Sequence, residues 1–568
     1  MRGRLRLQAS GVASGLLLAA ALSLLAPVLD GRARGGDASS RAAEEARWFG
    51  RTEPPAEDVL RFANGAEPEV LDPALLSGQS DQRIARALFD GLVEPDPRTL
   101  EPLPAMARWW EITADGRTYV FHLRTDAVWT NGEQVTARDF DYAWRRVLAP
   151  DTPARLADLL YPIRGARAFK KQESDPRRAL GLRAVDDTTF VVELENPTPY
   201  FLQLLTSTPF LPVHRATVEK HGDRWTRPEN IVTNGAFRLA VHRPNDRIVL
   251  ERFDRYWDVR NVRLEKVMVF ATDDLATMLN LYRAGITDWN PSGNLPAQYV
   301  PYVRGYADFR SSPFLATYFY SFNVTQPPLD DARVRRALAM AVDREKITTY
   351  LLHESKGPWG NVVAPGFEDY PYPEGVRFEP QAARRLLAQA GYPGGRGFPR
   401  IEILFNTSED HRKIAEAIQE MWKRELGIEV GLANQEFASY MKATTSLQYH
   451  IARRSWIADY ADPSNFLFVL RTGEGNNRSG WANTRFDSLL AVAGTTMDRA
   501  ERARILAEAE RIALEDMPFL PIYAYRTVEM LAPYVGGWYP TSMDLHPLKS
   551  LWIDRSGAAA VPGRGVTE

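Results

Sequence analysis

The chain has 568 residues, no cysteine and a formal net charge of −2. Without cysteine it can form no disulfide, and it cannot carry a lipoprotein anchor, which needs a cysteine at the new N-terminus. A near-neutral charge with scattered basic residues argues against a nucleic acid as partner. A chain this long exceeds one hydrophobic core, which predicts two or three lobes.

The N-terminus has the pattern of a secretory signal peptide. Arg2, Arg4 and Arg6 precede an apolar run over 12–29 and small residues over 31–33. This order predicts a signal peptide over 1–34, although the run is long enough that an uncleaved anchor stays an alternative. We therefore expect an exported protein, free in the periplasm and not a lipoprotein.

The predicted elements alternate between strands and helices. Helical periodicity, capping residues and alternating apolar residues distinguish the two. In chain order the predictions are strand 59–62, helix 84–92, strand 119–123, a helix capped by Thr136, strands 188–194, 236–239, 248–253 and 313–323, a helix after Asp331, strand 401–405, a helix from Ser408 to Gly427, and strand 428–432. The last strand, helix and strand have the spacing of a right-handed βαβ unit, so part of the sheet should be parallel. The predicted fold class is α/β or mixed, in more than one lobe.

Motifs of common enzymes are absent. There is no G-x-S-x-G elbow, Walker loop or H-E-x-x-H motif, and the eight histidines lack metal-ligand spacing. The glycine run 391–397 follows a helix and leads into a strand, so we interpret it as a helix C-cap and loop, not a phosphate cradle. Asp459 and Asp462 lack the pattern of a calcium loop. We predict no enzyme activity, cofactor or metal, although the paired carboxylates of glycoside hydrolases are set by the fold and leave no fixed spacing.

The segment 453–465, R-R-S-W-I-A-D-Y-A-D-P-S-N, carries the candidate site. It predicts a strand over 453–457 that runs into a bend, with Arg453 at one end and Asp459 at the other. An unpaired strand edge between them would leave main-chain groups free for an added peptide. A surface arginine and a turn carboxylate are the alternative interpretations. Asp462 before Pro463 is interpreted as the N-cap of a helix extending to Leu470.

Six segments together resemble the solute-binding proteins of peptide-importing ABC transporters, family 5 of the extracellular solute-binding proteins. They are 115–146, 231–237, 322–344, 406–436, 456–466 and 534–537, and the likeness runs from about residue 59 to 553. The resemblance implies a three-lobed, type II-like periplasmic binding protein, with two α/β lobes joined by a hinge and an extra lobe. The implied boundaries are 50–90, 215–315 and 526–568 for lobe I, 91–214 for lobe II and 316–525 for lobe III.

The resemblance also implies ligand contacts. Asp459 would take the α-ammonium of a short peptide with a free N-terminus, and Arg453 its carboxylate. The other implied contacts are the main chain of Ser455 to Ile457, including Trp456, the loop Ser77, Gly78 and Gln79 on the opposite side of the peptide, and side-chain pockets at Trp456 and Phe437. The implied partners are such peptides and a membrane permease, and the implied state is a monomer.

Several positions depart from the family pattern. Ile457 and Ala316 stand where a family member has cysteines, and Leu156, Ser321 and Thr445 replace a tyrosine, a glutamate and a histidine. The pockets should therefore differ from those of the family. A same-fold protein for a sugar, an opine or a chelated metal, and an exported hydrolase, remain alternative functions.

Overall fold

The structure is a computed structural model that describes residues 47–65, 67–76, 78–173 and 180–556. The predicted signal peptide, 1–34, and Ser77 lie outside the described residues. Among the described residues, no helix has both the length and the apolarity needed to cross a membrane.

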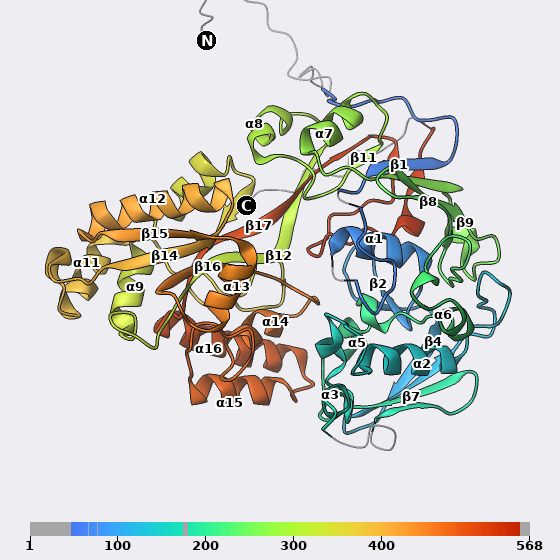
Figure 1. Cartoon of the computed structure of the whole chain (residues 1–568), viewed down its shortest axis with the longest axis horizontal. Coiled ribbons are helices and arrows are strands. Elements are labelled where there is room, and N and C mark those ends of the chain that lie inside the picture. The colour runs from blue at the N-terminus through green and yellow to red at the C-terminus, as the bar shows by residue number, and fades with distance from the viewer. Residues whose placement is uncertain (1–46, 66, 77, 174–179, 557–568) are drawn as a thin grey trace, which may run out of the picture. The chain divides into compact units, whose positions relative to one another are not determined.

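One eleven-stranded sheet runs through the molecule. Its strands lie in the order β15 (Val430–Gln435), β14 (Ile401–Asn406), β16 (Ile451–Ile457), β12 (Phe309–Phe322), β17 (Phe519–Leu531), β11 (Trp289–Asn290), β1 (Val59–Ala63), β10 (Lys266–Phe270), β9 (Arg247–Arg252) and β8 (Phe237–Arg243), and β13 (Lys356–Pro358) pairs with β17. Figure 1 shows the long strands β12 and β17 crossing from the part with β14–β16 to the part with β1 and β8. Their register shifts between Pro313 and Thr317 and again between Tyr318 and Phe319.

The predicted βαβ unit is confirmed. Strands β14 and β15 pair in parallel, and α12 (Glu409–Leu426) connects them. This helix buries Ile414, Ile418 and Trp422, and Gly427 ends it with a φ of 70°, a left-handed conformation that glycine adopts without strain. The predicted helix after Asp331 is α9 (Ala332–Met340), and the Asp331 side chain accepts a hydrogen bond from its first turn.

A separate antiparallel sheet lies within 91–214. It has the order β4 (Ala107–Ile112), β5 (Thr118–Leu123), β7 (Thr189–Glu193) and β6 (Leu182–Ala184). Helix α2 (Ala137–Leu148) packs against it and begins with the predicted capping box of Thr136 and Asp139. Two aromatic residues of this helix, Phe140 and Trp144, are fully buried in the core.

The helix predicted over 84–92 has different bounds. It is α1 (Gln79–Leu88), and Phe89 after it is extended. The apolar period is visible only in its second half, so its polar first turn gave no signal. It ends before Gly91 because the buried Asn234 side chain hydrogen-bonds both main-chain groups of Asp90 (3.2 and 3.0 Å).

Shorter elements complete the fold. The further α-helices are α3 (Ala166–Lys170), α5 (Phe201–Leu204), α6 (Arg215–His221), α7 (Leu275–Arg283), α8 (Val300–Val303), α10 (Arg344–Lys346), α11 (Pro380–Gln389), α13 (Phe437–Thr445), α14 (Ser464–Leu467), α15 (Thr484–Ala493) and α16 (Arg499–Asp516). Strands β2 (Val93–Pro95) and β3 (Pro102–Pro104) form one small sheet, and β18 (Val535–Gly536) and β19 (Trp552–Ile553) another. The glycine run 391–397 is a loop after α11, as predicted.

Separate hydrophobic cores confirm a mixed α/β protein of several lobes. The largest core joins residues of 60–303 and 528–553 with Tyr460, whereas two others are built within 315–523. The exact lobe boundaries stay a prediction.

Candidate ligand-binding site

The outer edge of β16 is open over its second half. Strand β14 pairs with β16 only at Ile451 and Ala452. On the other side, the His450 carbonyl accepts from the Asn323 amide (2.9 Å) and the Ala458 amide donates to the Leu315 carbonyl (2.8 Å).

Those two bonds fix the direction of every main-chain group between them. Alternate residues of a strand point their N–H and C=O groups to opposite edges, so the even-numbered residues face β12 and residues 453, 455 and 457 face outward. The Tyr440 hydroxyl donates to the Arg453 carbonyl. Among the described residues, the outward groups of Ser455 and Ile457 have no strand beside them.

Asp459 lies just beyond this edge, half-buried and without an ion-pair partner among the described residues. Its carbonyl accepts from Ser207 Oγ (3.4 Å), and its amide donates to Asn465 Oδ1 (3.3 Å). Burial, followed by the nearby Asp158 carboxylate, raises the pKa of Asp459 to about 6, and a hydrogen bond from Asn465 offsets part of this rise. Neither Asp459 nor Asp158 forms an ion pair with a described residue, so these two carboxylates make this end of the edge attractive to an ammonium group.

Arg453 lies at the other end and also lacks an ion-pair partner in the described part of the chain. Its guanidinium stacks over the Tyr318 ring at 4.8 Å and makes one long hydrogen bond to Asn406 Oδ1 (3.5 Å). Lys356 is another cation of this half of the protein without a described ion pair, and burial lowers its pKa to about 8. The open edge therefore runs from a cationic to an anionic end.

The remaining predicted site residues have different surroundings. Trp456 packs against an apolar core and donates its Nε1 hydrogen to Asn465 Oδ1 (2.7 Å). Phe437 begins α13, is 58% exposed and lies 6.4 Å from the Tyr440 ring. Gly78 is the N-cap of α1 and Gln79 its first residue, and no described hydrogen bond joins either to β16.

Asp462 has a structural role, as expected from its place before Pro463. Its Oδ1 accepts from the Ser464 amide (2.9 Å) at the start of α14, and both of its oxygens pair with Arg502 of α16. The assigned helix starts one residue later than predicted. A short 3-10 turn, Phe468–Leu470, continues it to the predicted end.

Comparison with known proteins identifies the family. The model of the bacterial extracellular solute-binding proteins, family 5, matches residues 101–478. The periplasmic oligopeptide-binding protein OppA of Salmonella typhimurium is 34% identical over 509 residues, which cover 86% of this chain and 90% of that protein. This chain belongs to family 5.

Solved structures of this family agree with the fold. The periplasmic murein tripeptide-binding protein MppA, in its unliganded open form, superposes with a TM-score of 0.77 at 32% identity and covers 88% of this chain and 98% of its own. Haemophilus influenzae OppA in complex with the peptide RPPGFSPFR has a TM-score of 0.71 at 33% identity and covers 88% of this chain and all of its own.

Sequence reasoning missed several residues around the site of this family member. Asp158 and Ser207 come from the segment predicted as lobe II, and Tyr440 from α13. None of them carries a local signal, because each lies outside the segment 453–465 that carries the site pattern. Ala316 and Ile457, where cysteines were expected from the family, are direct cross-strand partners.

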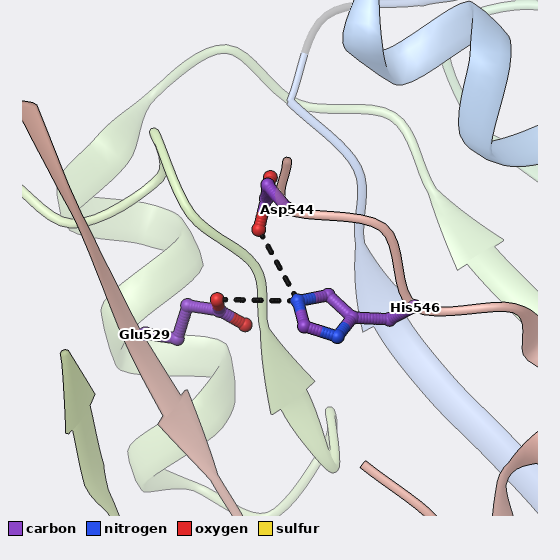
Figure 2. Close-up of side chains that lie close together, drawn as sticks. All are labelled: Glu529, Asp544 and His546. Carbon is purple, nitrogen blue, oxygen red and sulfur yellow. Dashed lines mark hydrogen bonds and ion pairs between the residues drawn. The ribbon is translucent and has the colours of Figure 1, made fainter. Parts of the chain in front are cut away.

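A second group of titratable side chains lies buried away from this edge (Figure 2). His546 Nε2 is 3.5 Å from Glu529 Oε1 and 3.3 Å from Asp544 Oδ1. Burial lowers the pKa of His546, but the two carboxylates outweigh it and raise the pKa to about 9. The imidazolium and Arg83, 3.5 Å from Asp544, thus balance both carboxylates. The group ties the segment after β18 to β17, and the predicted absence of a bound metal stays a prediction.

Proposed function

We propose that this protein captures short peptides with a free N-terminus in the periplasm and delivers them to the permease of an ABC importer, without chemical turnover. The open edge of β16 between Arg453 and Asp459 is the observation that carries the proposal. Its free main-chain groups suit a peptide backbone, and its two ends have charges opposite to those of peptide termini. The names of the relatives, which include oligopeptide-binding proteins, support it.

Each site residue has a distinct role in this proposal. Asp459 accepts hydrogen bonds from the α-ammonium, and the outward groups of Ser455 and Ile457 pair with the peptide main chain. Arg453 meets the C-terminal carboxylate of a short peptide. The main chain of Ser77, Gly78 and Gln79 pairs with the peptide from its other side, and Trp456 and Phe437 line side-chain pockets.

The separation of Arg453 and Asp459 limits the peptides that can contact both residues. Fully extended, Arg453 and Asp459 would lie about 20 Å apart at ~3.3 Å per residue, whereas a tripeptide spans about 10 Å. Either a bend after Ile457, where β16 ends, shortens this separation, or Arg453 and Asp459 serve ligands of different lengths. Closure of the lobes about β12 and β17, whose pairing is irregular near Tyr318, would complete the site.

Identifying the natural ligand tests this function. The protein is purified from the periplasm and denatured, and released molecules are identified by mass spectrometry. Short peptides with free N-termini are the expected result, and their lengths would give the preferred size directly. A single non-peptide solute would reject peptide capture and favour another ligand class for the same fold.

Ile457→Pro should weaken peptide binding at least about tenfold, because proline removes the outward N–H that pairs with the ligand. The bonds to β12 should survive, because the Ile457 amide faces away from that strand. Ile457→Ala, which keeps the N–H, is the matched control and should bind nearly as well as the wild type. Calorimetric titration of one tripeptide into all three proteins measures this, and equal affinities would contradict main-chain pairing at residue 457.

A further inference from the structure

Two arginines beside the open edge lack a counter-charge among the described residues. Arg454 and Arg478 form no ion pair with any acidic side chain in the part of the chain that the structure describes. Arg454 Nη1 donates to the Asn476 carbonyl (2.9 Å), and Arg478 Nη1 donates to Thr444 Oγ1 (3.2 Å). Burial and then the nearby charge of Arg478 lower the pKa of Arg454 to about 10. Two like charges this close repel each other, so an anion bound between them would stabilise the region.

An arginine can also be buried for a purely structural purpose, and Arg344 shows what that looks like here. Its Nε, Nη1 and Nη2 donate to three main-chain carbonyls at 2.8, 3.1 and 3.3 Å. Arg478 differs, because its buried Nε has no hydrogen-bond partner in the part of the chain that the structure describes. The hydrogen-bonding capacity of Arg478 is thus left partly unfilled by the described residues.

The pair borders the place where a peptide would lie. Arg454 shares one face of β16 with Trp456, because side chains alternate along a strand. Arg478 contacts α13, and the hydroxyl of Tyr440 in that helix reaches the Arg453 carbonyl at the open edge. A peptide paired with Ser455 and Ile457 sends alternate side chains to each face, so one of them points toward the Arg454 face.

We propose that Arg454 and Arg478 form a subsite for an acidic side chain, so that the preferred ligands are peptides containing aspartate or glutamate. The side-chain carboxylate accepts charge-assisted hydrogen bonds from the two guanidinium groups. This side-chain carboxylate is distinct from the C-terminal carboxylate of the peptide, which binds Arg453. This inference rests on the proposed peptide function.

Peptide pairs that differ only in one side-chain charge test the subsite. Dissociation constants are measured by calorimetry for tripeptides of alanine with Glu, Gln or Lys placed at each position in turn. At one position the wild type should prefer Glu over Gln by about 10- to 100-fold, the size of a charge-assisted hydrogen bond, and should bind Lys most weakly.

Arg478→Gln should reduce that preference to below about threefold, with the affinity for the Gln peptide nearly unchanged. Arg485→Gln is the matched control, because Arg485 is an exposed arginine that pairs with Glu508 (2.8 Å). It removes the same charge and should keep the preference. If Arg478→Gln fails to fold, the ratio of the dissociation constants of the Gln and Glu peptides for the wild type still tests the preference for an acidic side chain.

The outcomes separate this inference from the proposed function. If neutral and acidic tripeptides bind equally at all positions, the acidic subsite is rejected and peptide capture stands. A preference that persists in Arg478→Gln also rejects the assignment to this pair. If no tripeptide of the series binds, peptide capture and the subsite both fail.

Discussion

Replacing Asp459 by asparagine should weaken tripeptide binding by roughly 30-fold to several thousand-fold, the largest effect expected of any single change. The range corresponds to about 2–5 kcal/mol for truncating one partner of a desolvated charge pair. In the complex of the variant, the peptide ammonium would be buried beside the neutral asparagine amide, whose N–H groups point toward it and cannot accept its hydrogen bonds. Isothermal titration of one tripeptide into the wild type and Asp459→Asn measures the loss.

Acetylation of the peptide N-terminus gives the matched control. An acetylated tripeptide should bind the wild type as poorly as the free peptide binds Asp459→Asn, and the variant should not distinguish the two peptides. If Asp459→Asn still prefers the free N-terminus, the ammonium contacts another group, and the assignment to Asp459 is wrong.

The same carboxyl gives the pH dependence of peptide binding. With a pKa of about 6 in the free protein, Asp459 is charged above that pH and ready for an ammonium. Below it a proton must first be displaced, so affinity should fall about tenfold per pH unit. The peptide α-amino group loses its charge above about pH 8, so binding should be tightest between the two values. Asp459→Asn should lack the acid limb.

Arg453→Gln should produce the second largest loss, roughly 10- to 100-fold or more for tripeptides. The guanidinium has no other ion-pair partner among the described residues, so its charge is available to the C-terminal carboxylate of the peptide. Longer peptides should lose less, because their C-termini extend past Arg453 and end elsewhere. Affinities of a tripeptide and a pentapeptide for both proteins, measured by calorimetry, give the comparison.

A tripeptide amide serves as control for this residue. Amidation removes the terminal charge, so the amide should bind the wild type and Arg453→Gln with similar affinity. Arg453→Lys, which keeps a charge but not the planar fork, should recover only part of the loss. An equal loss for tripeptide, pentapeptide and amide would mean that Arg453 supports the fold of β16 and not ligand recognition.

The sequence by itself predicted those parts of the site that depend on local pattern. The extended stretch before Ile457, the bend that carries Asp459, and the capping role of Asp462 are all encoded within 13 residues. The βαβ unit around α12 was equally readable, because helix caps and periodicity are short-range properties. The predicted end of α1 was wrong because a distant side chain, Asn234, overrode the local signal.

Tertiary structure alone decided which groups of β16 are open. That Ser455 and Ile457 face outward follows from register with β12 and from the point at which β14 stops pairing, and neither leaves a trace in the segment itself. The lack of ion pairs at Arg454 and Arg478 among the described residues also could not be predicted from the sequence, because the two side chains approach each other only after folding. Local physics thus determined the shape and terminal charges of the strand, whereas long-range pairing determined its open edge and unbalanced charge.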